Sequence, residues 1–439
     1  MLQNLFQTAQ FIVDTRMISD FGGEDPIPMA AVAVVGPLCW SLATIFTITS
    51  VGATALVARR IGEGRGLDAS KAASVSLLVA FLAGLVVALF AGPIREVGVG
   101  FFRSLYGDDG GEAVSRAAAS YLDWYLLLFP LRSVLVTLES VLRGAGESLL
   151  PFWGGVVSNL ANVAGNALLI FGLLGLPRRG GAGAGLSTAL APVGELIFLR
   201  LVLRLSRSPR LRVRVMVWRD WSRDTARELL RISGPAFIGA LIFHSGFLVY
   251  QAAIFGLPAP SIAAHRVAIT IQSIGFLTAA GFYASAASLS GRLLGSGDPL
   301  LARRAAGRNA LYGLLLTLPM FLVFLVIPRS IVELLTEVPE SIGPATMCVM
   351  LGAIEIPFLM LTESLNGTLR GAGATRAPMV ITALGTWGMR VPLSWILTQE
   401  TSLGLAGVWV ATVADWALRA LLTAREVHRG NWLREELAS

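Results

Sequence analysis

Long apolar segments alternate with short polar ones along the whole of this 439-residue chain. Each segment holds about 18 residues or more, the length that an α-helix needs to cross the hydrocarbon core of a bilayer. The segments lie at 2–20, 29–58, 72–93, 117–142, 149–176, 183–205, 229–256, 260–291, 309–328, 342–369, 377–398 and 402–424. The pattern therefore predicts an all-α polytopic membrane protein with twelve transmembrane helices.

Prolines occur inside several of these segments, which are longer than a bilayer requires. They are Pro37, Pro130, Pro151, Pro192 and Pro357. Proline removes a backbone hydrogen bond, so it favours kinked helices that line a cavity. Proline and glycine are also frequent in ordinary membrane helices, which leaves both interpretations open.

One five-residue sequence, Leu-Arg-Gly-Ala-Gly, occurs twice, at 142–146 and 369–373. Two further pairs keep the same order: Gly-Glu-Gly at 62–64 with Gly-Ser-Gly at 295–297, and the segments 183–188 and 407–412. The members of each pair are about 225 to 235 residues apart, which indicates a duplicated unit. Because each copy would hold six spans, an even number, both enter the membrane from the same side and form parallel repeats.

The duplication predicts two pseudo-symmetric lobes of six helices each. We place the N-lobe at 1–205, a cytoplasmic inter-lobe linker at 206–228 and the C-lobe at 229–439. The linker lies in the longest polar stretch, which is rich in arginine. Anionic lipid head groups are the expected partner of these arginines, in preference to nucleic acid.

Composition and charge support a membrane location. The chain is 54% hydrophobic and 14% charged, and its mean hydropathy of +0.69 is too high for a soluble surface. Lysine and arginine gather in alternate loops, which predicts that these loops and both termini are cytoplasmic in the cell membrane. The net charge of +7 then reflects topology. The first segment lacks a cleavable signal pattern, so we expect a retained span, with a natural start upstream of Met1 as an open alternative.

Catalytic and metal-binding patterns are absent from the sequence. Cys39 and Cys348 lie inside apolar segments with neither a Cys-x-x-Cys spacing nor a nearby histidine, which favours core packing. No His-Glu-x-x-His pattern, paired acidic metal motif or nucleophile elbow occurs. We therefore expect no enzyme, and no cofactor apart from a coupling ion.

Asp14, inside the first apolar segment, is the leading candidate for ion coupling. An ionisable group inside a bilayer costs several kcal/mol unless it lines water or finds a partner. Gln10 lies one turn away on the same helix face. The alternative is that Asp14 caps the helix or pairs with Arg16.

Three asparagines within 149–176 recur at intervals of three and four residues, which places their amides on one face of a helix. They are Asn159, Asn162 and Asn166. Amide oxygens can ligate Na⁺ or accept a hydrogen bond from a protonated carboxyl group, so we expect this face to point at Asp14. Hydrogen bonding that only holds the bundle together is the alternative.

The second half also holds ionisable groups in mid-span. His244 could carry a proton, and a role as a satisfied buried histidine is the equal alternative. Glu363 and Arg390 have opposite signs, so we expect them to pair, because an unpaired buried charge is costly; otherwise Glu363 faces a cationic substrate. Asp415 and Arg419 form an i,i+4 pair with an expected structural role.

Aromatic and polar side chains complete the candidate cavity. Tyr250 offers a ring face to an organic cation, and Gln272 offers an amide, with ordinary packing as the alternative for both. Glu139 and Glu195 are unexplained acidic residues in the first half. Arg200 lies close enough to Glu195 in the sequence to screen it in part.

Four stretches resemble the multidrug and toxic compound extrusion (MATE) family of transporters, and together they extend over nearly the whole chain. They are 11–17, which contains Asp14, the two Leu-Arg-Gly-Ala-Gly copies, 261–268 with 295–299, and 159–172. The resemblance, which is closest to the DinF-like branch, implies twelve helices in two six-helix lobes. It also implies export of organic, often cationic, compounds driven by inward movement of Na⁺ or H⁺.

By this resemblance, four residues occupy the positions of the N-lobe cation site: Asp14, Asn162, Asn166 and Thr188. Part of the family has aspartate where this chain has Asn166, so the site carries one fewer titratable group and the choice between Na⁺ and H⁺ stays open. His244 stands where some relatives have a glutamate used in coupling. The expected substrate or cavity residues are Gln10, Asn159, His244, Tyr250, Gln272 and Glu363.

The sequence therefore predicts a cation-coupled antiporter that exports organic compounds, cationic or amphipathic, by alternating access. We expect small organic substrates and the lipid bilayer as its partners, no nucleic acid, and a monomer. An exporter of a specific metabolite, or a flippase for a lipid-linked substrate on the same fold, is the alternative.

Overall fold

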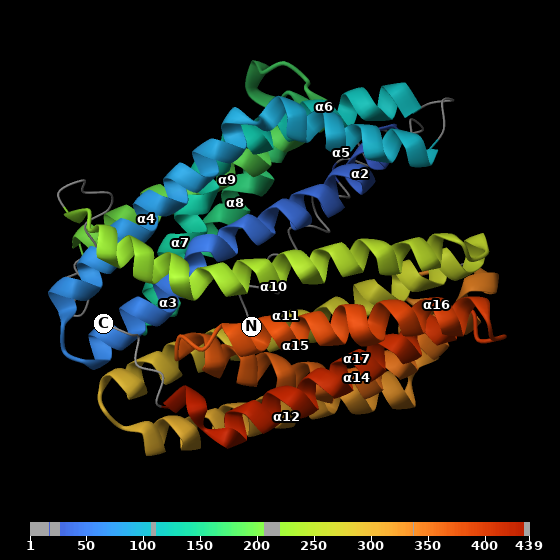
Figure 1. Cartoon of the computed structure of the whole chain (residues 1–439). Helices are drawn as coiled ribbons and strands as arrows, with labels where there is room; N and C mark the ends of the chain where they lie inside the picture. Colours follow the sequence, from blue (N-terminus) through green and yellow to red (C-terminus); the bar gives the residue numbers. More distant parts are fainter. Residues whose placement is uncertain (1–16, 18–26, 107–110, 206–219, 337, 434–439) are drawn as a thin grey trace. The chain divides into compact units, whose positions relative to one another are not determined.

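The computed structural model describes residues 17, 27–106, 111–205, 220–336 and 338–433. Within these ranges the secondary structure is helical, with no strand (Figure 1). Among the described residues, ten helices are long and apolar enough to cross a membrane, and a bent pair of helices makes up to an eleventh span. The predicted span at 2–20 lies outside the described residues, whereas each of the other eleven predicted segments overlaps an observed span. The prediction of an all-α polytopic membrane protein is confirmed.

The helices, in chain order, are α2 (Ile27–Leu42), η1 (Ala43–Phe46), α3 (Thr47–Gly62), α4 (Gly66–Leu89), α5 (Ala91–Tyr106), α6 (Gly111–Leu127), α7 (Phe129–Ala145), α8 (Leu149–Phe171), η2 (Leu173–Gly175), α9 (Gly180–Leu205), α10 (Arg223–Phe255), α11 (Ala259–Gly295), α12 (Pro299–Val326), α13 (Pro328–Glu333), α14 (Pro339–Gly371), α15 (Arg376–Ala383), η4 (Leu384–Arg390), α16 (Val391–Gln399), α17 (Leu405–Arg429) and η5 (Asn431–Leu433). Among these, α5 and α13 fall between the predicted spans.

The chain divides into two compact units. Among the described residues, the N-unit comprises those within 17–53 and 66–229, and the C-unit comprises those within 54–65 and 230–433. The last part of α3 therefore packs with the C-unit, although the sequence around it belongs to the first repeat. In addition, α10 begins at Arg223, inside the stretch predicted as the linker.

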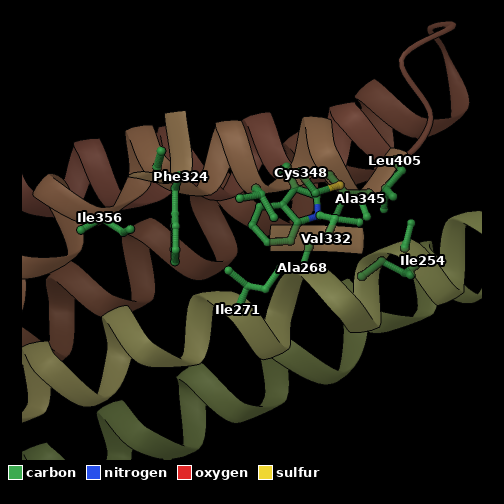
Figure 2. Close-up of a cluster of buried hydrophobic side chains, with 14 of the residues drawn as sticks. Ile254, Ala268, Ile271, Phe324, Val332, Ala345, Cys348, Ile356 and Leu405 are labelled. Carbon is green, nitrogen blue, oxygen red and sulfur yellow. The ribbon is translucent and has the colours of Figure 1, made fainter. Parts of the chain in front are cut away.

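The core of the C-unit forms where α11 and α17 pack against α14. Figure 2 shows Ala345 and Cys348 of α14 close to Ala268 of α11, and Ile356 and Ile271 belong to the same cluster of buried side chains. Cys348 is fully buried here as a small core residue. Helices in lipid associate mainly through close packing, because lipid tails are as apolar as the side chains themselves.

In the N-unit, α4 packs on α7, and α9 packs on both α8 and α6. The rings of Phe46 and Phe129 stack with their centroids 5.0 Å apart in its core. At the crossing of α8 and α9, a side chain on Gly183 would overlap the backbone at Leu169. The glycine therefore allows the two helices to approach closely enough for short polar side chains to meet.

The duplicated sequences fold into equivalent turns. In the two Leu-Arg-Gly-Ala-Gly copies, Gly146 and Gly373 have φ values of 90° and 89°. In both, the amide of this glycine donates to the carbonyl three residues earlier, and the next amide donates to the carbonyl five residues before it. Both turns have the helix C-cap geometry that favours glycine. The repeat seen in the sequence is thus also a repeat of local structure.

Two of the long spans depart from a regular α-helix. The span formed by 114–127 and Phe129–Ala145 bends by 56° directly before Pro130, which has no N–H to bond with the preceding turn. The span from α15 to α16 contains η4, a seven-residue π-helix. Such π-segments often occur at functional sites. The prediction of kinked helices is confirmed for the span that contains Pro130.

Candidate functional site

Three of the predicted ion-site residues meet inside the N-unit at the interface of α8 and α9. The amide nitrogen of Asn162 donates to the Thr188 hydroxyl over 3.2 Å. The amide nitrogen of Asn166 donates to the side-chain oxygen of Asn162, also over 3.2 Å. Both asparagines are fully buried, and the Ser187 hydroxyl donates to the Asn162 carbonyl over 2.8 Å. We call Asn162, Asn166, Ser187 and Thr188 the amide cluster.

The amide cluster follows from helix geometry. Residues four apart on one helix lie on the same face, so Asn162 and Asn166 stack along α8. The hydroxyls of Ser187 and Thr188 come from the early part of α9, where Gly183 and Gly185 allow close approach to neighbouring backbone. The cluster contains donors and acceptors but no charge of its own.

Asp14 and Gln10 lie outside the described residues. Met17, three residues after Asp14, packs against Ile170 of α8 and Ala184 of α9. Ile170 lies one turn beyond Asn166, and Ala184 lies one turn before Thr188. The first predicted span therefore has one described residue, and this residue borders the amide cluster.

Asn159 is on α8 but lies apart from the hydrogen bonds of the amide cluster. It is half-buried, and its amide nitrogen has no hydrogen-bond partner within the described ranges. Of the predicted row of three asparagines on α8, therefore, only Asn162 and Asn166 belong to the amide cluster.

A second buried polar group in the C-unit centres on Asp415 of α17. One carboxylate oxygen lies 2.7 Å from Nε of Arg390, and the other lies 2.5 Å from Nε of Arg419. Nη2 of Arg419 also donates to the Thr386 hydroxyl over 2.6 Å. Asp415 is fully buried, and the two arginines are 4% and 3% exposed. We call Asp415, Arg390 and Arg419 the arginine cluster.

The arginine cluster corrects one prediction and confirms another. Arg390 pairs with Asp415, so the predicted pair of Glu363 and Arg390 is wrong. The structural pair of Asp415 and Arg419 is confirmed. Helical spacing identifies partners on one helix, whereas Arg390 reaches Asp415 from a different helix. The direction of the Arg390 side chain depends on the π-segment η4, which sequence patterns do not predict.

Aromatic rings enclose the two arginines. The guanidinium of Arg390 lies 5.7 Å from the ring centroids of Phe243, Tyr250 and Trp416. That of Arg419 lies 5.0 Å from the Trp416 centroid. Cation–π contacts stabilise a buried cation. Tyr250, predicted to receive a substrate cation, therefore contacts a cation of the protein, and it is 3% exposed.

The other predicted cavity residues of the C-unit have separate surroundings. The ring of His244 packs edge-on against Phe243, with centroids 5.7 Å apart. Gln272 is 3% exposed, and within the described ranges neither its Nε2 nor the carboxylate oxygens of the buried Glu355 of α14 have a hydrogen-bond partner. Glu363 is half-buried, and the charges of Arg370 and Arg419 act on its carboxylate. Glu355 was not singled out from the sequence, although it is a mid-span acid in the same apolar segment as Glu363 and the cost of an ionisable group in a bilayer would have identified it.

A helical membrane protein that buries hydrogen-bonded amides and paired charges inside its helical units has the features of a secondary transporter. The MatE family model matches residues 1–168 and 235–396, and the chain belongs to this family, the MATE transporters. It is thus a transporter and not an enzyme. The comparisons do not distinguish branches of the family, so the likeness to the DinF-like branch stays a prediction.

Relatives of similar length support this conclusion. A probable multidrug resistance protein NorM from Thermotoga maritima is 26% identical over 430 residues, which cover 98% of this chain and 90% of that protein. Another probable multidrug resistance protein NorM, from Bradyrhizobium diazoefficiens, is 27% identical over 441 residues, with 97% and 90% covered. An outward-facing structure of a multidrug resistance MATE family transporter of the MOP superfamily superimposes with a TM-score of 0.88 at 20% identity, covering 99% and 95%. The fold is therefore the twelve-helix MATE fold.

Proposed function

We propose that this transporter is a cation-coupled antiporter that exports organic compounds, cationic or amphipathic, by alternating access, with Na⁺ or H⁺ as the coupling ion. The observation that carries the proposal is the amide cluster, because fully buried amides and hydroxyls inside a membrane helix pair are costly unless they serve packing or a ligand. In this proposal Asp14 supplies the ionisable group, and Asn162, Asn166 and Thr188 supply neutral oxygens around it.

The packing of Met17 supports a role for Asp14 beside the cluster. Met17 contacts α8 and α9 within one turn of Asn166 and Thr188. Asp14 precedes Met17 by three residues, so on a helix it would occupy nearly the same face one turn earlier. A carboxylate at that place would complete an oxygen-rich site for Na⁺, or would itself carry a proton.

Antiport requires that the ion changes the affinity for the substrate. A ligand that binds both conformations with equal affinity does not shift the equilibrium between them. Coupling therefore needs an ion that favours one conformation and a substrate that favours the other. An acid that gains or loses its charge inside the protein meets this requirement, because charge changes both hydration and the attraction for a cationic compound. The relatives named as probable multidrug resistance proteins support organic compounds as the exported class.

The proposal is tested by ethidium efflux from proteoliposomes under an imposed Na⁺ gradient and, separately, an imposed pH gradient. We expect one of the gradients to drive efflux, and the Asp14→Asn variant to lose this drive while still binding ethidium. Full efflux in the Asp14→Asn variant would contradict the coupling role of Asp14. Dye binding and elution as a single species on gel filtration serve as the folding controls.

An exporter of a specific metabolite, or a flippase for a lipid-linked substrate, is the second candidate. The observation that bears on it is the pair of buried arginines in the C-unit, Arg390 and Arg419, which share the carboxylate of Asp415 and also act on Glu355 and Glu363. A guanidinium group suits an anionic substrate group better than a cationic dye. Absence of ethidium efflux under both gradients, with folded protein, would favour this candidate.

The same proposal includes the setting in which transport occurs. We place the protein as a monomer in the cell membrane with both termini cytoplasmic, because lysine and arginine gather in alternate loops. Small organic substrates and the lipid bilayer are its proposed partners. Cysteine accessibility labelling at the two termini in intact and permeabilised cells would test the orientation.

A further inference from the structure

We propose that Arg132 of α7 is a specificity residue that binds a carboxylate of an exported organic compound, with the ring of Tyr125 as the support of its guanidinium. The inference rests on the proposed export function and deepens it, because it names a chemical group of the exported compound. Arg132 belongs to the N-unit and takes no part in the amide cluster.

Arg132 lies deep inside a membrane span. The part of α7 from Arg132 to its end at Ala145 is about 20 Å long at the usual rise per residue, and the hydrocarbon core of a bilayer is about 30 Å thick. A charged side chain at such a depth is costly. Arginines there almost always face the interior of the helix bundle or a water-filled space. Arg132 therefore calls for an anionic partner or a ligand.

The nearby acids pair with other arginines. Asp123 and Glu139 are the acids nearest to Arg132 in the sequence. The Asp123 carboxylate lies 3.0 Å from Nη1 of Arg95, and the Glu139 carboxylate lies 3.5 Å from Nη2 of Arg143. Nε of Arg132 is buried and has no hydrogen-bond partner within the described residues. An anion that reached this guanidinium would meet an unused donor.

An aromatic ring holds the guanidinium in place. The guanidinium carbon of Arg132 lies 5.4 Å from the centroid of the Tyr125 ring. The Tyr125 hydroxyl donates to the carbonyl of Cys39 over 3.3 Å, and its ring packs edge-on against Phe129 with centroids 5.9 Å apart. A cation–π contact stabilises the charge through the ring face and leaves the N–H donors at the guanidinium edge unused. Arg132 is thus positioned without being neutralised.

The bend of the span adds to the attraction for an anion. The span bends by 56° directly before α7. The Arg132 amide donates to the Leu128 carbonyl over 3.3 Å, so Arg132 lies in the first turn of α7. The start of a helix carries a partial positive charge, and interrupted helices of transporters often direct such ends at anionic substrate groups. Arg132 is half-buried, which leaves its side chain accessible.

The geometry and the depth favour an organic carboxylate. A guanidinium presents parallel N–H donors that fit the two oxygens of a carboxylate. The phosphates of membrane lipids stay in the head-group regions, outside the hydrocarbon core. An amphipathic compound can place its apolar body among apolar side chains while its carboxylate gains a charge-assisted hydrogen bond. Such a compound also neutralises a charge that is costly to leave unpaired.

The first test compares two dyes that differ at one group. Unsubstituted rhodamine is a zwitterion with one carboxylate, and its methyl ester is a cation. Binding of each to the purified, full-length protein in detergent is measured by fluorescence anisotropy. We expect Arg132→Gln to weaken binding of the zwitterion by roughly 10- to 100-fold, the usual effect of losing a hydrogen bond to a charged group. Binding of the ester should be unchanged or tighter. Equal effects on both dyes, or no binding of the zwitterion to the wild type, would overturn the proposal.

Two further variants control for charge. Arg116→Gln removes an exposed arginine from α6 of the same unit and should bind both dyes like the wild type. Arg132→Lys keeps the charge but loses the planar fork of donors, so we expect an intermediate affinity for the zwitterion. If Arg116→Gln weakens binding as much as Arg132→Gln, the net charge of the unit is responsible, and the proposed site is wrong.

Thermal unfolding supplies a readout without ligand. We expect Arg132→Gln to change the unfolding temperature little, because removal of an unpaired buried charge offsets the lost cation–π contact. The zwitterionic dye should raise the unfolding temperature of the wild type but not that of Arg132→Gln. A marked fall for Arg132→Gln without dye would contradict the proposal, because it would show that a carboxylate elsewhere in the chain depends on Arg132.

Efflux assays separate this inference from the proposed function. If the wild type exports ethidium under an ion gradient and Arg132→Gln binds the two rhodamine dyes as the wild type does, the carboxylate site fails and the antiport function stands. If Arg132→Gln selectively loses the zwitterion but the wild type exports neither ethidium nor rhodamine under either gradient, the binding site stands and the antiport function fails.

Discussion

Gly62 and Gly295 occupy equivalent places where the end of α3 crosses the end of α11. A methyl group on Gly62 would overlap the carbonyl oxygen of Arg292, and one on Gly295 would overlap the carbonyl oxygen of Arg59. Gly62 lies three residues after Arg59, which Gly295 faces. Gly295 in turn lies three residues after Arg292, which Gly62 faces, so the contact is reciprocal. Small residues at such crossings allow two membrane helices to approach backbone to backbone.

We predict that Gly62→Ala and Gly295→Ala each lower the free energy of unfolding by about 1–3 kcal/mol, since backbone atoms cannot move aside as a flexible side chain can. Thermal unfolding of the purified protein in detergent measures the change. Gly307→Ala is the control, because Gly307 lies within a helix with open space around the added methyl group. Comparable losses for all three variants would contradict the role of the crossing.

The arginine cluster predicts a large effect from the loss of one negative charge. Asp415→Asn should lower stability by about 3–5 kcal/mol, because two buried arginines lose their only strong anionic partner in the cluster. Glu333→Gln breaks the exposed ion pair with Arg329 and should change the unfolding temperature little. Differential scanning fluorimetry distinguishes the two, and a small effect of Asp415→Asn would show that the buried charges are compensated elsewhere.

The amide cluster predicts that removal of one hydroxyl, by a substitution that nearly keeps the shape of the side chain, reduces ion coupling. Thr188→Val removes the hydroxyl that accepts from Asn162 and should reduce gradient-driven ethidium efflux, with a stability cost of about 1–3 kcal/mol. Thr346→Val is the matched control, since the Thr346 hydroxyl bonds to a carbonyl of its own helix. Efflux equal to that of the control would leave the cluster with a packing role alone.

His244→Gln tests whether the coupling ion binds in the C-unit. The imidazole packs edge-on against Phe243, so we expect the variant to keep most of its gradient-driven efflux. The assay is the same as for Asp14→Asn, measured on proteoliposomes with equal protein content. Complete loss of efflux, with normal folding, would move the ion site to the C-unit.

Local patterns in the sequence were sufficient for the spans, the kink at Pro130 and the partnership of Asp415 with Arg419. Each depends on residues that are close along the chain: a long apolar run, a missing N–H or a spacing of four. The same reasoning failed for Arg390, whose partner lies 25 residues away on another helix. It also left Glu139 and Glu195 as two separate puzzles, because residues 56 positions apart on different helices share no local spacing.

The sequence by itself determined that this protein is a helical membrane protein built from a duplicated unit, because hydrophobic length and repeated turns are properties of the chain alone. Its class as a transporter came from the resemblance of its motifs to the MATE family. Only the tertiary structure decided which buried polar groups meet. Asn162 and Thr188, like Arg390 and Asp415, come from different helices. Their contacts depend on helix rotation, on glycines such as Gly183 and on the π-segment η4. Local spacing along the sequence does not encode which of these interhelical contacts is the most stable.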